Sequence, residues 1–500
     1  MIAGVLPVTI VEALAQRLEV AAVELGQDTT TLPEAPEDRA MALLVGLPEH
    51  IVPRPGPELW LYLVAALGRF PVASEVEAAA RVLELDGPDA LTAHTLDVVR
   101  RAPFSVRADL RMEIVTDRVV IAADYCARED NHTGVQRVTR ALAQRWHVQH
   151  GAVAVADIDE RSAYRNLAPR EAARVYRYGL EVDIDPADEQ AYRPVLVVPF
   201  RTTVILPEVV HWDSSPTNLC LAAYSGNATC AIGYDTIPIL SSSLRPQGEA
   251  GVFTRYLSVV KHLTRVAAIS HSAGNEFQGF VDMLSAQGLE GPRVEAIPLA
   301  TEIDGHDKPA RSRAPGERPL VVIPARLEAH KNVLTAVQSA HRLWQEGLEF
   351  ELVLLGGAGV GQELVFDAVK AIQEEGHPIK RLGWVSDEVM WQTFTDAAFI
   401  VFISLHEGYG LPLVEAMSCG APVLTSNIGS QAEIAATGGC LTVDPRSLTS
   451  VADGMRELIT RPELRAELAA QIPERPVRSW DEYAADVWDF AVHARTGARA

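Results

Sequence analysis

The stretch from residue 397 to residue 427, "AAFIVFISLHEGYGLPLVEAMSCGAPVLTSN", decides the fold class. Its first apolar run, residues 397–405, is typical of a buried strand, and residues 421–426 are typical of a second one. Between them lie a glycine-rich turn and a short helix. A strand, a helix and a further strand in this order indicate an open parallel sheet, in which ligands bind outside the carboxyl ends of the strands. Glu407 follows the first strand, so we expect it at that edge.

The turn before this helix has the composition of an anion site. Gly408 and Gly410 permit a tight turn, and Pro412 suits the first position of a helix. The backbone N–H groups of residues 409–411 should then point out of the helix start, where they can hold a phosphate. Glu415 falls in the first turns of the helix, where the helix dipole favours a carboxylate by about 0.3–1 kcal/mol.

Two carboxylates, Glu407 and Glu415, therefore flank one phosphate cradle. A carboxylate can accept hydrogen bonds from a vicinal diol such as that of a ribose. Ribose, phosphate and a further polar group together describe a nucleotide sugar, and we predict a site for one here. The alternative interpretation is that Glu415 is a surface residue that the helix dipole favours.

Apolar runs alternate with helical segments in two series, residues 117–300 and 320–426. Residues 1–105 contain helical pieces broken by proline-rich turns, without a strand pattern or a catalytic cluster. We predict an α/β protein with two Rossmann-like doubly wound domains facing a cleft. The expected parts are a helical accessory region, an N-terminal domain, a C-terminal domain and a helix that packs back on the domains: 1–105, 106–304, 305–478 and 479–500.

Composition excludes several classes of protein. A formal charge of -22 and a pI near 5.1 argue against a general nucleic-acid binder, which needs a basic surface. The N-terminus lacks the pattern of a secretory signal, and no long uncharged apolar run occurs, so we expect a cytoplasmic protein. The sequence leaves open a peripheral contact with the inner face of a membrane.

The cysteines lack metal-site spacing and are expected to be reduced thiols: Cys126, Cys220, Cys230, Cys419 and Cys440.

Residues 320–435 resemble the donor domain of the retaining family 4 glycosyltransferases, which have the GT-B fold. The hallmark of that family is a pair of glutamates separated by seven residues, in a sequence similar to "EGYGLPLVEAMSCGAPVLTS". The resemblance implies that Glu407 contacts the transferred sugar, that Glu415 binds the ribose, and that the turn between them binds the donor. The donor-binding turn consists of Gly408, Tyr409, Gly410 and Leu411, with Tyr409 where the family usually has Phe.

Three further residues of the second series are candidates for donor binding. Arg326 and Lys331 lie in "PARLEAHKNV", after the first strand, where two cations can neutralise a departing diphosphate. Solvated loop cations are the alternative, and the resemblance favours the catalytic role. Trp384 matches the place where relatives hold the nucleotide base with backbone groups, although a packed aromatic explains its side chain equally well.

The first series offers fewer candidates. Gly134 lies between a strand and a helix, where the resemblance implies a loop that faces the donor. Asp235 ends a strand, at a place where the resemblance implies a residue near the reacting sugar. The alternative is that it organises the turn before a proline. His271 is a candidate for the acceptor side, although a residue at the start of a helix is the simpler interpretation. Arg137 and Arg140 could face an anionic acceptor or a membrane, but a solvated helix face is the favoured interpretation.

These residues predict a retaining glycosyltransferase that moves a sugar from a nucleotide-diphosphate sugar, with a preference for a GDP-mannose-like donor. The hydroxyl acceptor would be a glycan, a lipid-linked molecule or a protein, in polysaccharide or glycoconjugate synthesis. No cofactor and no metal are expected, and the sequence leaves a homo-oligomer open. The N-terminal domain would hold the acceptor and the C-terminal domain the donor.

Several alternatives remain beside this prediction. Asp157 with Asp159, and Asp183 with Asp185, imitate the metal-binding pair of the other glycosyltransferase fold, although such pairs are common in an acidic chain. A phosphorylase would need a lysine-bound pyridoxal, for which the sequence makes no clear case. The other hypotheses are a nucleotide-sugar epimerase and a non-catalytic scaffold subunit. A scaffold subunit would be expected to lose the charged residues of the cleft.

Overall fold

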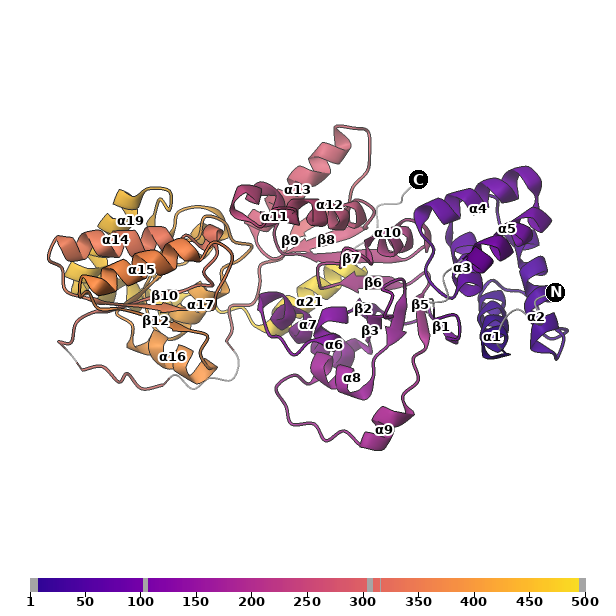
Figure 1. Cartoon of the computed structure of the whole chain (residues 1–500), viewed down its shortest axis with the longest axis horizontal. Coiled ribbons are helices and arrows are strands. Elements are labelled where there is room, and N and C mark those ends of the chain that lie inside the picture. Colours follow the sequence, from indigo (N-terminus) through magenta and orange to yellow (C-terminus); the bar gives the residue numbers. More distant parts are fainter. Residues whose placement is uncertain (1–7, 102–106, 304–308, 315, 494–500) are drawn as a thin grey trace.

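The computed structural model describes residues 8–101, 107–303, 309–314 and 316–493. Figure 1 shows three bodies in a row: a helical region, a first sheet domain and a second sheet domain. The first sheet domain is built on β1–β9 and the second on β10–β15. Both sheets carry helices on their two faces, which confirms the predicted α/β class (Figure 1).

The helical region packs against the edge of the first sheet (Figure 1). The side-chain amide of Gln16 donates to the carbonyl of Met112 (2.9 Å) and accepts from its N–H (2.8 Å). These hydrogen bonds satisfy backbone groups of the edge strand β1 that would otherwise lack a partner. Arg17 is buried and donates to the carbonyls of Ala65 and Leu110. The helices are α1 (Val8–Glu24), α2 (Pro36–Gly46), η1 (Leu47–His50), α3 (Pro57–Leu67), α4 (Ala73–Asp86) and α5 (Pro88–Arg101).

The first sheet has nine strands in the order β1-β5-β4-β3-β2-β6-β7-β8-β9. The strands are β1 (Met112–Val115), β2 (Val120–Ala122), β3 (Val153–Asp157), β4 (Tyr164–Asn166), β5 (Leu196–Pro199), β6 (Thr203–Leu206), β7 (Ala228–Gly233), β8 (Arg265–Ala268) and β9 (Arg293–Ala296). β4 departs from the parallel pattern of this sheet, because it pairs antiparallel with β3 and β5. β4 is short and carries polar side chains, so no apolar run marks it.

Helices of the first sheet domain cover both faces of its sheet (Figure 1). They are α6 (Asp124–Arg128), α7 (Gly134–His150), α8 (Pro169–Tyr176), α9 (Pro186–Ala191), α10 (Ser215–Tyr224), α11 (Ile237–Leu240), η2 (Ser242–Leu244), α12 (Glu249–Val260) and α13 (His271–Ser285).

The second sheet is wholly parallel, in the order β12-β11-β10-β13-β14-β15. Its strands are β10 (Leu320–Pro324), β11 (Glu351–Leu355), β12 (Ile379–Gly383), β13 (Phe399–Phe402), β14 (Val423–Ser426) and β15 (Cys440–Val443). The helical segments are η3 (Ala329–Lys331), α14 (Val333–Gln345), α15 (Glu363–Glu374), α16 (Asp387–Asp396), α17 (Leu411–Ser418), α18 (Gly429–Ala435), α19 (Leu448–Thr460), α20 (Pro462–Gln471) and η4 (Ile472–Glu474).

After the second sheet domain the chain returns to the first. Helix α21 (Trp480–Trp488) lies against α7, and the π-helical turn η5 (Asp489–His493) follows it. Trp146 of α7 donates from its indole to the carbonyl of Ala484 (3.0 Å), and its ring lies 5.8 Å from that of Trp488. The tryptophans of this last helix therefore fix it to the first sheet domain.

The expected boundaries at 105–106 and 304–305 lie outside the described residues. Within the part of the chain that the structure describes, no helix is both long and apolar enough to cross a membrane.

Candidate functional site

The predicted turn lies between β13 and α17, at the carboxyl end of the second sheet. Gly410 adopts φ 113°, a conformation that favours glycine, and precedes the first residue of α17. Pro412 occupies the second helical position, so the helix starts one residue earlier than expected. Glu415 is buried on this helix with 6% of its surface exposed, so it is not a surface residue.

Lys331 lies directly beside Glu407. The lysine Nζ donates to Glu407 Oε1 at 2.6 Å, and both side chains are largely buried. Arg326, the other predicted cation, is 66% exposed and points its Nε at the carbonyl of Ala358 (3.0 Å). The structure thus brings Lys331 to the two-glutamate turn and leaves the Arg326 side chain at the surface.

Arg137 of α7 reaches across to the second sheet domain and forms an ion pair with Glu415. The interpretation of Arg137 and Arg140 as a solvated helix face is wrong. Arg140 is buried with 4% of its surface exposed, and it donates to the carbonyls of Glu129 and Arg174 (3.0 Å each), so it organises the first sheet domain. Of the two arginines, Arg137 forms the ion pair with the second sheet domain.

The two sheet domains touch at Gly408. A Cβ atom added to this glycine would lie 2.4 Å from the carbonyl oxygen of Tyr234, so any larger residue would push the domains apart. Ser270 Oγ donates to the carbonyl of Gly408 (2.7 Å). Asp235 also lies at this contact, with its Oδ2 3.2 Å from the same added Cβ. Burial raises the pKa of Asp235 to about 6, although its Oδ1 accepts a hydrogen bond from the N–H of Ile237.

A polar contact that the sequence did not suggest links the domains through His406. Its Nε2 lies 2.7 Å from Glu276 Oε1 and its Nδ1 lies 2.8 Å from Ser241 Oγ. Burial alone would lower the pKa of His406, but the hydrogen bond and charge of Glu276 outweigh it and raise the pKa. Burial likewise opposes the pKa shift of Glu276, and His406 outweighs it, so the pKa of Glu276 is lowered.

His271, the candidate on the acceptor side, lies exposed at the start of α13. Its backbone N–H donates to Glu433 Oε2 (3.0 Å), and the N–H of Ser272 donates to Glu433 Oε1 (2.6 Å). A carboxylate from α18 therefore satisfies the first N–H groups of a helix in the other domain. His271 thus meets the second sheet domain through its backbone N–H.

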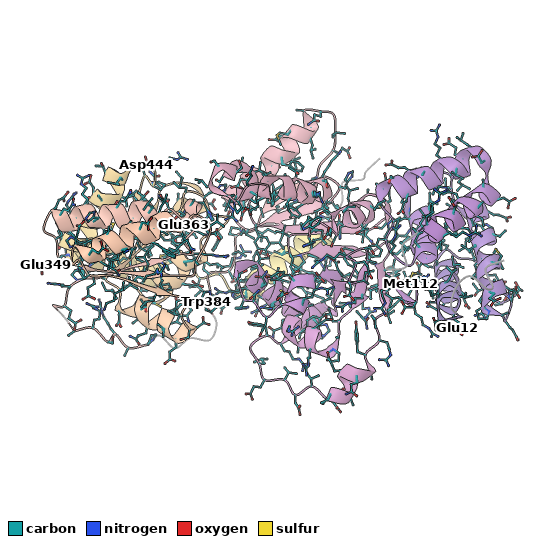
Figure 2. All side chains as sticks on the ribbon, in the orientation of Figure 1. Glu12, Met112, Glu349, Glu363, Trp384 and Asp444 are labelled. Atoms are coloured by element: carbon teal, nitrogen blue, oxygen red, sulfur yellow. The ribbon has the colours of Figure 1, made fainter. Side chains whose placement is uncertain are left out.

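Between the domains lies a pocket of about 640 Å³, lined by residues of both. Arg137, Glu415 and Trp384 line it together with the backbone of Gly356 and Gly357. Trp384 is 89% exposed, so its side chain is not a packed aromatic. Figure 2 shows it on the side of the second sheet domain that faces the first.

Gly134 begins α7 beside this pocket. A Cβ atom added to it would lie 3.5 Å from Leu411 Cδ1, so the loop of the first sheet domain faces the turn of the second.

A second pocket, of about 240 Å³, lies at the carboxyl ends of β2, β3 and β6. Asp124, Tyr125, Asp157 and Glu208 line it. Burial and the neighbouring Asp124 raise the pKa of Asp157 above its usual range. Tyr125 is 43% exposed at this pocket.

The acidic pairs that imitate a metal motif are not clustered as metal ligands among the described residues. Asp157 accepts a hydrogen bond from Ser214, whereas Arg128 approaches Asp159 at 3.5 Å. Asp185 accepts a hydrogen bond from the N–H of Ala187 at the start of α9 (2.8 Å). Hydrogen-bonding and ion-pair roles therefore explain Asp157, Asp159 and Asp185.

Residues 305–475 match the family described as glycosyl transferases group 1. O-antigen chain mannosyltransferase B of Escherichia coli is 33% identical over 144 residues, which are 27% of this chain and 37% of that protein. Serotype-specific mannosyltransferase WbdA of Escherichia coli is 23% identical over 343 residues, 64% of this chain and 40% of that protein. The chain therefore spans well under half the length of these curated relatives.

The fold is also shared with solved structures. Sucrose-phosphate synthase from Thermosynechococcus elongatus superposes with a TM-score of 0.53 at 13% identity, over 75% of this chain and 98% of that one. At this identity the likeness concerns the fold, which is GT-B, as the sequence predicted. Residues 305–475 thus match the group 1 glycosyl transferases, in a chain whose two sheet domains have the GT-B arrangement.

Proposed function

We propose that this protein is a retaining glycosyltransferase that moves a sugar from a nucleotide-diphosphate sugar to a hydroxyl acceptor. One observation carries the proposal: Glu407 and Glu415 flank a glycine turn at the carboxyl end of a parallel sheet, and both meet a cation there. Such an edge is where open α/β sheets bind ligands. The pocket of about 640 Å³ beside it is of the size that ligand sites have.

The donor would span the turn. Glu415, which is buried, would accept hydrogen bonds from the ribose hydroxyls, and the base would lie on Trp384. The N–H groups at the start of α17 would hold the diphosphate. Glu407 would then face the hydroxyls of the sugar to be transferred.

In the reaction, the bond between the anomeric carbon and the diphosphate oxygen breaks, and a bond to the acceptor oxygen forms on the same face. The acceptor proton passes to an oxygen of the leaving diphosphate, so no protein nucleophile is needed. Negative charge grows on the diphosphate as its bond to the sugar breaks, and Lys331 and Arg326 would stabilise it. Lys331 is already held in the cleft by Glu407. No step of this reaction requires a metal.

The acceptor would enter through the smaller pocket of the first sheet domain. Its carboxylates, Asp124 and Asp157, can accept hydrogen bonds from sugar hydroxyls. Tyr125 offers an exposed ring against which the face of a sugar can pack. These features favour a glycan acceptor. A mannose donor carried by GDP is favoured because two similar proteins are named mannosyltransferases.

The proposal is tested by titrating the purified protein with GDP-mannose, GDP-glucose, UDP-glucose, UDP-N-acetylglucosamine and ADP-glucose, followed by transfer assays with mannosides. We expect tightest binding of GDP-mannose and transfer that persists with excess chelator. Binding of donor without transfer or hydrolysis would instead favour a scaffold subunit. Conversion of the donor sugar into its epimer, without transfer, would favour an epimerase.

A further inference from the structure

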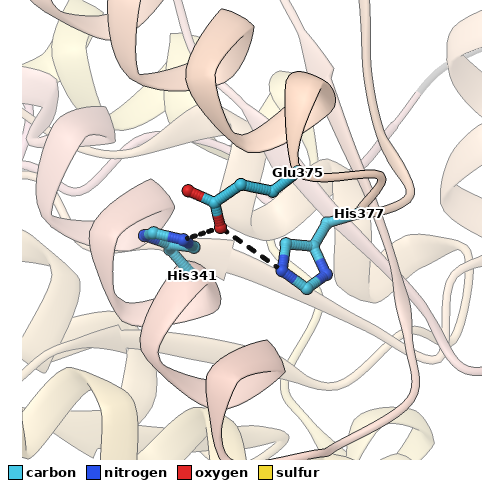
Figure 3. Close-up of side chains that lie close together, drawn as sticks. All are labelled: His341, Glu375 and His377. Carbon is cyan, nitrogen blue, oxygen red and sulfur yellow. Dashed lines mark hydrogen bonds and ion pairs between the residues drawn. The ribbon is translucent and has the colours of Figure 1, made fainter.

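Two histidines and a glutamate meet on the second sheet domain (Figure 3). His341 Nε2 lies 2.7 Å from Glu375 Oε2, and His377 Nε2 lies 3.7 Å from the same oxygen. One ligand atom of each residue lies within 4.8 Å of the other two. Figure 3 shows the carboxylate between the two imidazole rings.

Three chain segments build this cluster. His341 lies in the last turns of α14, Glu375 directly follows α15, and His377 precedes β12. The ring of His377 stacks on that of Trp344 at 5.1 Å with an interplanar angle of 8°. Trp344 in turn stacks on Phe350 at 4.6 Å. Packing therefore fixes the orientation of the His377 ring, as neighbouring groups commonly do for metal ligands.

The charge around the cluster favours a cation. Among the described residues, no lysine or arginine forms an ion pair with Glu375, whose partners are the two histidines. The carboxylate side chain is 47% exposed, and the histidine side chains are 28% and 25% exposed, so an ion can reach all three from solvent.

We propose that His341, Glu375 and His377 bind one divalent ion of the Zn²⁺ type. Imidazole nitrogen and carboxylate oxygen are ligands that Zn²⁺ takes, at about 2.0–2.2 Å. Two ligands of a tetrahedral ion at that bond length are about 3.3 Å apart, and the observed 2.7 and 3.7 Å lie on either side of that value. Because Glu375 is the exposed member of the cluster, a small rotation of its carboxylate would adjust both distances. Gln345 Nε2 also approaches His341 Nε2 (3.3 Å), so the fourth position would lie near this amide.

The place of the cluster in the sheet indicates a structural ion. His377 lies before the start of β12, whereas Glu407 lies after the end of β13. In a parallel sheet the two residues are therefore at opposite ends of the strands. Figure 2 shows Glu349, in the segment between α14 and β11, at the end of the domain that is remote from the first sheet domain. The ion would join α14 to the segment before the edge strand β12. This inference does not depend on the proposed glycosyl transfer.

The test uses the full-length protein without a histidine tag, treated with EDTA and then desalted. Titration with Co²⁺, followed by its visible absorption, should give one tightly bound ion per chain, which Zn²⁺ displaces. His341→Ala and His377→Phe should each weaken Co²⁺ binding by more than about tenfold. The phenylalanine keeps a ring on Trp344, so loss of binding there reports the missing ligand. Glu374→Gln, one residue away from Glu375, is the matched control and should bind as the wild type does.

Zn²⁺ should also raise the thermal midpoint of the wild type by about 3 °C or more, and leave that of the His341→Ala protein unchanged. The proposal is overturned if the wild type gives no absorption band in the micromolar range of Co²⁺. It is equally overturned if His341→Ala and His377→Phe bind Co²⁺ with wild-type affinity, since the ion then lies elsewhere. If circular dichroism shows that either histidine variant is unfolded, Glu375→Gln takes its place in the test. Weaker Co²⁺ binding by Glu375→Gln then supports the proposal, and wild-type affinity overturns it.

Discussion

Arg137 and Glu415 form an ion pair across the cleft, although they belong to different sheet domains and are 278 residues apart. Glu415 is the carboxylate proposed to bind the ribose, so a donor must either share this carboxylate with Arg137 or displace it. A displaced guanidinium would remain beside the pocket, where the diphosphate brings negative charge. The pair therefore couples the donor site to the first sheet domain.

Replacing this arginine should weaken donor binding. We expect Arg137→Ala to raise the Kd for GDP-mannose about tenfold, because the diphosphate loses a nearby cation. Calorimetry measures the change, and Arg293→Ala, an exposed arginine of the same domain, is the control. Tighter binding by Arg137→Ala would contradict the prediction and identify the arginine as a competitor for Glu415.

Trp384 should report the nucleotide base. Stacking of a base on an aromatic ring contributes about 1–3 kcal/mol, so Trp384→Ala should weaken donor binding by about tenfold or more. GDP should also quench the tryptophan fluorescence of the wild type, and this quenching should fall in the variant. Leu382→Ala changes another exposed apolar residue nearby and should bind GDP normally. Unchanged quenching in Trp384→Ala would place the base elsewhere.

The contact between the two sheet domains, here called closure, should depend on pH through His406 and Glu276. The pKa of His406 is raised, so its contribution to the closed form is present at low pH and is lost as the pH rises through that pKa, above 6.5. The pKa of Glu276 is lowered from 4.5, so its contribution is lost only as the pH falls through that lowered pKa. Closure is therefore favoured between the two values.

X-ray scattering at pH 6 and pH 8.5 measures this effect as a larger radius of gyration at the higher pH. His406→Ala should remove the difference, whereas His94→Ala, in the helical region, should keep it. A radius that does not change with pH in the wild type would show that this pair does not control closure.

Asp235 should set an acid limit on activity. Because the pKa of Asp235 is about 6, few molecules carry the carboxylate form below pH 6. If this carboxylate is needed at the reacting sugar, kcat/KM should fall about tenfold for each pH unit below 6. A carboxyl whose folded pKa is raised stabilises the fold at low pH and loses that contribution as the pH rises through 6. Asp235→Asn should thus be less active yet about 1–3 kcal/mol more stable at pH 8. A variant that keeps both the activity and the acid limit would exclude this role.

Local sequence was sufficient to predict the strand, the turn and the helix around Glu407 and Glu415. Apolar runs, two glycines and a proline determine those conformations over a few residues, and the strands of a parallel sheet bring their carboxyl ends to one edge. The short antiparallel β4 could not be predicted in this way, because its polar residues carry no apolar pattern.

Contacts between the domains could not be predicted either. The ion pair of Arg137 with Glu415, and the contact of His406 with Glu276, depend on how two separately folded sheets face each other. A solvated helix face was the simplest interpretation of Arg137 because nothing within its own helix reveals a partner from another domain. The cluster of His341, Glu375 and His377 was missed for the same reason, since no metal-motif spacing joins α14 to the segment before β12.

The central claim is tested most directly by comparing wild-type protein with Glu407→Gln in transfer from GDP-mannose to a mannoside, with NMR of the product's anomeric proton. We predict that the wild type releases GDP and forms a product with the anomeric configuration of the donor. The Glu407→Gln protein should keep the wild-type circular dichroism and lose at least about 10²-fold in kcat, while Glu363→Gln, an exposed carboxylate of α15, remains active. Full activity of Glu407→Gln, or a product of inverted configuration, would contradict the proposed function.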